Sequence, residues 1–414
     1  MTEAGTSDAV PITHQLTQAN AANIFKWQFN STDDTVGTDD LGYIVSEPMN
    51  NRANGQTGQI ALMNNGQFAA ILGNGVSSAS GKAALYILFA DGPAAGNWSG
   101  RYVKLVADNV GVGNGLSQPI WVDSNGDGKA DIIYAGDLKG NLWKFDVSSA
   151  SPANWKVAYE GRPLFIAKDG AGNLLPITSS PEFRSHPLGG LMINIATGKA
   201  IVPSDFPNSS RTHAIFGIWD KVTFAGMTAA ELDANLPWTL GKVLEPRTFV
   251  GGTGLKRGLT GGVIDWSKRV GWHLPFNVAS EMSVSNPTVA LNELFIVSVS
   301  PPLPPAEGET EPCFQSPQAR LTVISSITGL PSGILGKTTI RKPDGSTEAV
   351  YAASTDVSDQ KIRITPDTVS ADCKGRESAC VRAVKGTPGS EDVYRGHKRE
   401  YRLFWREIPG LKTR

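Results

Sequence analysis

Apolar, strand-like segments that recur in pairs constrain the fold of this chain more than any other feature. In each pair an apolar run leads through a turn to a second run, commonly one that ends in an acidic or polar residue, and pairs recur at intervals of roughly 50 to 80 residues. The five pairs are 67–75 with 84–91, 131–137 with 140–146, 199–203 with 213–220, 293–300 with 320–325, and 349–353 with 361–365. Such recurrence is typical of a β-propeller, which repeats a four-stranded blade and tolerates insertions between strands.

Turn and helix signals agree with an all-β class. The 414 residues include 45 glycines and 26 prolines, which favours short strands and tight turns over long helices. One short helix is predicted at Met227–Leu236, because Thr228 and Glu231 form a capping box there. Residues 1–24 lack a strong periodicity, so we expect a poorly ordered N-terminal segment.

An oxygen-rich loop at residues 123–131 has the spacing of a calcium site. Calcium takes six to eight oxygen ligands, and a loop with donors at alternate positions can wrap the ion by itself. Gly128 falls where such a loop must turn sharply. The predicted ligands are Asp123, Asn125, Asp127, the carbonyl oxygen of Lys129, and Asp131.

The calcium loop is predicted to join two strands. A helix–loop–helix site would end with a bidentate Glu at its twelfth position, where this chain has Tyr134. The flanking runs 119–122 and 132–134 are short, apolar and rich in β-forming residues. The alternative interpretation is an ordinary Asp- and Gly-rich turn that holds no metal, since the same residues dominate turns.

Charge and hydropathy exclude several classes of partner. The formal net charge is −1, with scattered Lys and Arg, so we expect neither nucleic acid nor an anionic membrane surface as a partner. No apolar stretch is long enough to span a membrane. Residues 1–20 carry no secretory signal, so either the protein is cytoplasmic or Met1 is not the start of the natural chain.

Three cysteines, Cys313, Cys373 and Cys380, lie in the last quarter of the chain. Their spacing suits no zinc site, and an odd number leaves at least one without a partner in the chain. We expect a disulfide between Cys313 and either Cys373 or Cys380, and a local Cys373–Cys380 bridge is the alternative.

The sequence contains no complete motif for nucleotide binding or catalysis. Residues 75–82 resemble a phosphate-binding loop but have five residues between the glycines and Ala83 where a hydroxyl is required. Gly336-Lys-Thr338 lacks the upstream glycine. No nucleophile elbow or zinc-protease motif occurs, and the five histidines are scattered. The sequence therefore predicts a metal loop and no catalytic set.

The run Ala135-Gly-Asp-Leu-Lys-Gly-Asn-Leu-Trp-Lys-Phe-Asp146 resembles the C-terminal β-propeller domain of the PilY1-type pilus-tip adhesins. Other passages fit this family in the same order, so that the resemblance spans roughly residues 25 to 410. They are 41–48, 63–75, 113–119, 197–199, 216–220, 271–272, 286–287, 312–313 and 405–407.

The resemblance implies a modified seven-bladed propeller with loop insertions over residues 25–414. It implies secretion, with a signal peptide upstream of residue 1, and a place at the pilus tip, the outer membrane or the periplasm. It also implies a role in type IV pilus biogenesis, adhesion and twitching motility, in which calcium controls pilus extension against retraction. Minor pilins and a host or abiotic surface are the implied partners, and the implied calcium ligands are the five residues of the loop. No Arg-Gly-Asp tripeptide is present to support integrin binding.

Two functions from different classes fit these features. The first is a non-enzymatic module of pilus assembly and adhesion that binds calcium. The alternative is a quinoprotein-like dehydrogenase that uses pyrroloquinoline quinone, because residues 135–143 also resemble the repeat that docks the blades of those enzymes. The motif is clear only once and the calcium loop is self-contained, which favours the first function.

Overall fold

The computed structural model describes residues 26–36, 39–45, 50–51, 56–221, 238–239, 244–251, 256–290, 292–301, 318–342, 344–357, 362–366, 380–385 and 392–397. Within them the fold is all-β, as predicted, and its helical elements are the single turn α2 (Ala158–Gly161) and the 3-10 turns η3 (Ser31–Asp33), η4 (Pro152–Asn154) and η5 (Pro203–Asp205). A helix long and apolar enough to cross a membrane is not found in this part of the chain. The predicted segment 1–24, the predicted helix Met227–Leu236, Cys313 and Cys373 lie outside it.

Four antiparallel, four-stranded meanders dominate the described fold, as expected of propeller blades. Meander 1 contains β3 (Ile60–Met63), β4 (Phe68–Gly73), β5 (Ala83–Phe89) and β6 (Tyr102–Asp108). Meander 2 contains β7 (Ile120–Val122), β9 (Ile132–Gly136), β10 (Asn141–Asp146) and β12 (Phe165–Ile166). Meander 3 contains β13 (Glu182–Ser185), β14 (Leu191–Ala196), β15 (Ala214–Asp220) and β19 (Gly271–Pro275). Meander 4 contains β20 (Thr288–Ala290), β21 (Glu293–Ser300), β22 (Gln318–Ser325) and β24 (Thr347–Asp356).

Further strands extend or accompany these meanders. The strands β8 (Lys129–Ala130), β11 (Lys156–Val157), β16 (Trp238–Thr239), β17 (Leu244–Gly251), β18 (Lys256–Gly261) and β23 (Lys337–Arg341) pair with meander strands or with each other. Two small sheets consist of β1 (Asn50–Asn51) with β2 (Gln56–Thr57), and of β25 (Ile362–Pro366), β26 (Cys380–Lys385) and β27 (Asp392–His397). Seven blades are not resolved in the described residues, so that number stays a prediction.

Three of the five predicted strand pairs are confirmed. They are β4 with β5, β9 with β10, and β21 with β22. The prediction for 199–203 is wrong: this run lies in a loop that enters η5, and the strand that pairs with β15 is β14. The last pair is also wrong, because β24 joins β22 and β18 whereas β25 pairs with β26.

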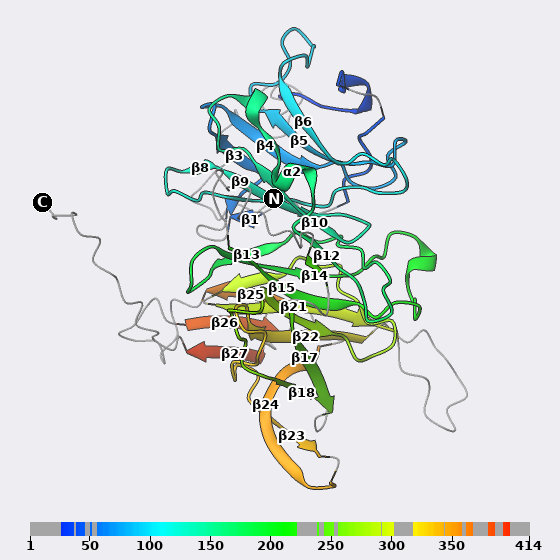
Figure 1. Ribbon diagram of the computed structural model, residues 1–414, viewed down its shortest axis with the longest axis vertical. Coiled ribbons are helices and arrows are strands. Elements are labelled where there is room, and N and C mark those ends of the chain that lie inside the picture. The colour runs from blue at the N-terminus through cyan, green and yellow to red at the C-terminus, as the bar shows by residue number, and fades with distance from the viewer. Residues whose placement is uncertain are drawn as a thin grey trace, which may run out of the picture.

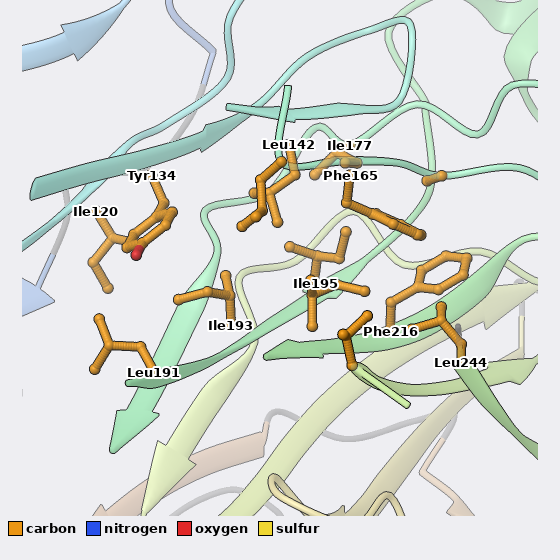
Figure 2. Packing of buried hydrophobic residues seen from close by; sticks show 14 of the residues in the cluster. Ile120, Tyr134, Leu142, Phe165, Ile177, Leu191, Ile193, Ile195, Phe216 and Leu244 are labelled. Atoms are coloured by element: carbon orange, nitrogen blue, oxygen red, sulfur yellow. The ribbon is translucent and has the colours of Figure 1, made fainter. Parts of the chain in front are cut away.

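The meanders are stacked face to face along the long axis of the molecule (Figure 1). Apolar side chains fill each space between successive meanders, and β17 and β18 join meanders 3 and 4 into one sheet. Between meanders 2 and 3, Figure 2 shows Tyr134, Leu142 and Phe165 on one side and Ile193 and Phe216 on the other. Similar clusters fill the spaces between meanders 1 and 2 and between meanders 3 and 4.

Strand β9 shows why these strands have no polar face. Successive residues of a strand point to opposite faces of its sheet. Accordingly Ile133 belongs to the core toward meander 1 and Tyr134 to the core toward meander 3. All five residues of β9 are buried, so the continuous apolar run Ile132–Ala135 is what a strand between two sheets requires.

A buried charge cluster lies within the core between meanders 2 and 3. The Lys144 ammonium is 2.7 Å from Asp220 Oδ2, and both side chains are almost fully buried. The hydroxyls of Tyr134 and Tyr159 donate to the same carboxylate at 2.5 and 2.8 Å. Burial and the Asp220 charge raise the pKa of both tyrosines, which therefore remain neutral donors.

A second cluster of a lysine and two tyrosines, here with the two carboxylates of Asp34 and Asp40, lies on the outer face of meander 1. Asp34 accepts hydrogen bonds from Tyr86 at 2.6 Å, Tyr102 at 2.7 Å and Lys104 at 2.8 Å. Asp34 belongs to a segment, residues 26–36 and 39–45, that we call the N-terminal strap. Phe29 of the strap covers part of this face of meander 1 and contacts the rings of Tyr86 and Tyr102.

Candidate functional site

The predicted calcium loop joins β7 to β8 and β9 at one end of meander 2. It is a strand-to-strand loop, as predicted. Gly126 and Gly128 both have a φ of +83°, and nothing lies within 4 Å of a Cβ placed on either residue. Glycine is therefore required at these positions by backbone conformation and not by crowding.

Asp123 organises the loop. Its Oδ1 accepts the amides of Gly126 at 2.7 Å and Asp127 at 3.2 Å, and its Oδ2 accepts the amide of Gly128 at 2.7 Å. The side-chain oxygen of Asn125 accepts the Asp127 amide at 2.8 Å. These bonds wrap the backbone around one carboxylate, which an Asx-type turn does without a metal.

A cationic side chain already contacts the loop carboxylates. Lys129 Nζ lies 2.8 Å from Asp127 Oδ2, and both side chains are about one-third exposed. The hydrogen bond from Lys129 lowers the pKa of Asp127. Asp127 in turn raises the pKa of Lys129, with smaller contributions from Asp131 and Asp123. The loop therefore presents a field that favours a cation.

Asp131 is held in the interior, unlike the rest of the loop. It is 3% exposed. Its Oδ2 accepts the hydroxyl and amide of Ser124 at 2.6 and 3.0 Å, and its Oδ1 accepts the side-chain amide of Asn64 at 2.9 Å. Asn64, from the turn between β3 and β4, also donates to the carbonyls of Ala130 and Val147. Nothing in the sequence pattern indicated that Asn64 contacts the loop, or that Ser124 within the loop donates to Asp131.

The donor types of this loop fit calcium, because carboxylate, amide and carbonyl oxygens are the ligands that this ion takes. Their arrangement is not that of a preformed site. In the described ranges, no three His, Cys, Asp or Glu side chains are arranged to hold a metal ion. Binding at the loop would require Asp127 to leave the Lys129 ammonium, and Asp123 and Asp131 to exchange some of their present hydrogen bonds for the ion.

The family model described as the PilY1 beta-propeller domain matches residues 17–242, more than half of the chain. The chain belongs to the PilY1 β-propeller family.

Curated relatives and a solved structure agree with this family. The type IV pilus biogenesis factor PilY1 of Pseudomonas aeruginosa PAO1 is 33% identical over 274 residues, which cover 59% of this chain and 22% of the relative. A PilY1 homolog of Xylella fastidiosa is 29% identical over 303 residues, covering 68% of this chain and 18% of the relative. The chain thus spans about a fifth of the length of these relatives. The crystal structure of the P. aeruginosa PilY1 C-terminal domain shares the fold with a TM-score of 0.66 at 23% identity, over 89% of this chain and 74% of that one.

The motif that carried the resemblance to PilY1 proteins has a structural role in this chain. Asp137 is fully buried, and its Oδ2 accepts hydrogen bonds from Asn114, Asn141 and Trp143 at 2.8 to 2.9 Å. Its Oδ1 accepts the amides of Lys139 and Asn141. Burial raises the pKa of Asp137, although these hydrogen bonds act in the opposite direction. With both oxygens occupied, this carboxylate holds the turn between β9 and β10 and the indole of Trp143.

Proposed function

We propose that this chain is a propeller module of a type IV pilus biogenesis factor. The observation that carries the proposal is the PilY1 family match over residues 17–242, in a chain built of four-stranded antiparallel meanders. On this proposal the complete ring has seven blades. The module is non-enzymatic, lies outside the cell or in its envelope at the pilus tip, and contacts minor pilins and the surface to which pili attach.

Replacement of the matching segment of P. aeruginosa PilY1 by this chain tests the proposal. We expect cells with the chimera to make surface pili and to twitch, whereas cells whose PilY1 lacks the segment do not. Immunoblots of envelope fractions ensure that both proteins are present. A chimera that is made and exported but leaves pilus number at the level of the deletion would contradict a role of this module in biogenesis.

We propose further that the loop at 123–131 binds one calcium ion through Asp123, Asn125, Asp127, the Lys129 carbonyl and Asp131. The support is the donor set and the cation-favouring field around Lys129. Occupancy of this site would set the balance of pilus extension and retraction. We expect calorimetry to give a stoichiometry near one and a Kd on the order of 10⁻⁶ to 10⁻³ M.

Asp127→Ala should abolish this calcium binding and leave the circular dichroism spectrum unchanged, because Asp127 is exposed and outside the core. Asp344→Ala is the matched control, since Asp344 is also exposed and accepts the amide of the residue two positions later. Unchanged calcium affinity in Asp127→Ala would show that the ion, if bound, lies elsewhere. Loss of the folded spectrum would show that this loop is part of the scaffold.

Lys129→Met should have the opposite effect and tighten calcium binding. The substitution keeps the backbone carbonyl and removes the ammonium that contacts Asp127 at 2.8 Å. Because the pair is exposed, the gain is at most about fivefold in Kd. Calorimetry measures the change in Kd. Lys342→Met is the control, because Lys342 pairs with Glu348 outside the calcium loop. Weaker binding in Lys129→Met would mean that Asp127 is not a ligand.

A further inference from the structure

A pocket lies at the opposite end of β9 from the calcium loop. Its volume is about 270 Å³, and it is lined by loops of three successive meanders. Residues 76–81 connect β4 to β5, residues 111–114 connect meanders 1 and 2, Leu138 lies in the turn between β9 and β10, and residues 199–202 follow β14. The five residues of β9 separate this pocket from the calcium loop by roughly 17 Å.

The pocket offers hydrogen-bond donors that the protein does not use. In this described part of the chain, the backbone amides of Ser77, Ser78, Ala79, Gly111 and Gly113 donate no hydrogen bond. Successive unpaired amides in a turn that includes a residue of positive φ form a concave site that favours an anion.

The charged side chain that lines the pocket is Lys199, and no Asp or Glu lines it. Asp205 keeps the lysine in place: it contacts Lys199 Nζ at 3.1 Å and accepts the amides of Ile201 and Val202 at 3.0 Å. One salt-bridge contact leaves an ammonium with further donor capacity, because it carries three N–H groups.

The backbone of the pocket is also held in an uncommon conformation. Ser77 has a φ of +58°, in the left-handed region that residues other than glycine seldom adopt. The loop is fixed there by bonds from the Ser80 amide to Asp39 and from the Gly81 amide to Ser78. Such conformations gather at ligand sites, where surrounding bonds maintain them.

We propose that this pocket binds a small oxyanion group, a carboxylate, sulfate or phosphate. The group accepts hydrogen bonds from the free amides of the 77–79 loop and from Lys199. This is not a nucleotide loop: Lys82, which ends the glycine-rich run, lies 3.9 Å from Asp40 of the N-terminal strap and does not line the pocket. The cation comes instead from Lys199, in a different meander. The site goes beyond the proposed function and does not depend on it.

Calorimetric titration of the purified chain with sodium phosphate, sulfate and acetate tests the proposal, in calcium-free buffer at constant ionic strength. We expect saturable one-to-one binding of at least one anion. A preference for acetate indicates a carboxylate ligand, and a preference for phosphate or sulfate a tetrahedral one. Lys199→Ala should weaken binding at least about tenfold, as expected for loss of a charged hydrogen bond. Lys342→Ala, which removes a paired lysine elsewhere, should not.

Ser78→Ala is a control within the same loop. The buried hydroxyl is out of reach of a ligand, so its removal should leave anion affinity unchanged and leave the Tm unchanged or raise it. Absence of saturable binding with all three anions would overturn the proposal. Equal affinity in wild type and Lys199→Ala would overturn it as well.

Discussion

Asp220→Ala is expected to destabilise the protein by about 3–5 kcal/mol, the usual cost of removing one partner from a buried ion pair. The variant deletes the carboxylate that lies 2.7 Å from the Lys144 ammonium and accepts the hydroxyls of Tyr134 and Tyr159. Those three groups remain in the core between meanders 2 and 3. Urea unfolding followed by tryptophan fluorescence measures the change.

Two further variants separate the charge from its position. Asp265→Ala removes an exposed acid paired with Lys268 and should change stability little, since exposed pairs contribute little. The double variant Lys144→Met, Asp220→Leu replaces the pair by apolar side chains and should recover much of the loss. A double variant as unstable as Asp220→Ala would show that the cost comes from packing and not from the buried ammonium.

Acid should destabilise the fold strongly between pH 6.5 and pH 4. Burial lowers the pKa of His186, His213 and His273 to about 4 from a usual value of 6.5. The folded state therefore holds these rings neutral where the unfolded chain binds protons. Their contribution to stability is fully present above pH 6.5 and is lost as the pH falls toward 4, by up to about 1.4 kcal/mol per pH unit for each ring.

Urea unfolding at several pH values between 4.5 and 7.5 measures this slope. His213→Gln should reduce the slope by the contribution of one ring, because His213 is 3% exposed and its Nδ1 lies 3.1 Å from the hydroxyl of Thr197. His186 should behave similarly, since its ring stacks on Trp219 at 4.1 Å and its Nε2 has no partner. A free energy of unfolding that is flat from pH 7 to pH 5 would contradict neutral burial of these histidines.

The sequence predicted those parts of the fold that local pattern determines. The run Ile132–Ala135 reads as a buried strand, and its glycine turn leads directly to β10. The failure at 199–203 has a physical cause: the amides of Ile201 and Val202 bond to Asp205 in η5, so this apolar run cannot pair as a strand. The pairing of β24 with β18 joins residues about a hundred positions apart, which no local pattern shows.

The sequence predicted the position of the loop at 123–131 but not the contacts that its side chains make. Spacing located Asp123 through Asp131 between two strands. Spacing could not show that Asn64 reaches Asp131 from another meander, or that the Lys129 side chain occupies the cation position at Asp127. The charge cluster of Lys144 and Asp220 was missed for the same reason, because 76 residues separate its members.

The two lysines in the buried clusters also restrict the order in which sheets can stack. Lys104 meets Asp34 of the N-terminal strap, and Lys144 meets Asp220 at the end of β15. An apolar face alone would accept almost any other apolar face, and these meanders are apolar on both sides. A sheet stacked out of order would bury an ammonium with no carboxylate to receive it, at a cost of several kcal/mol. Each buried lysine therefore favours the one neighbour that supplies a carboxylate. This pairing distinguishes the correct arrangement from other stacks that would bury a similar apolar area.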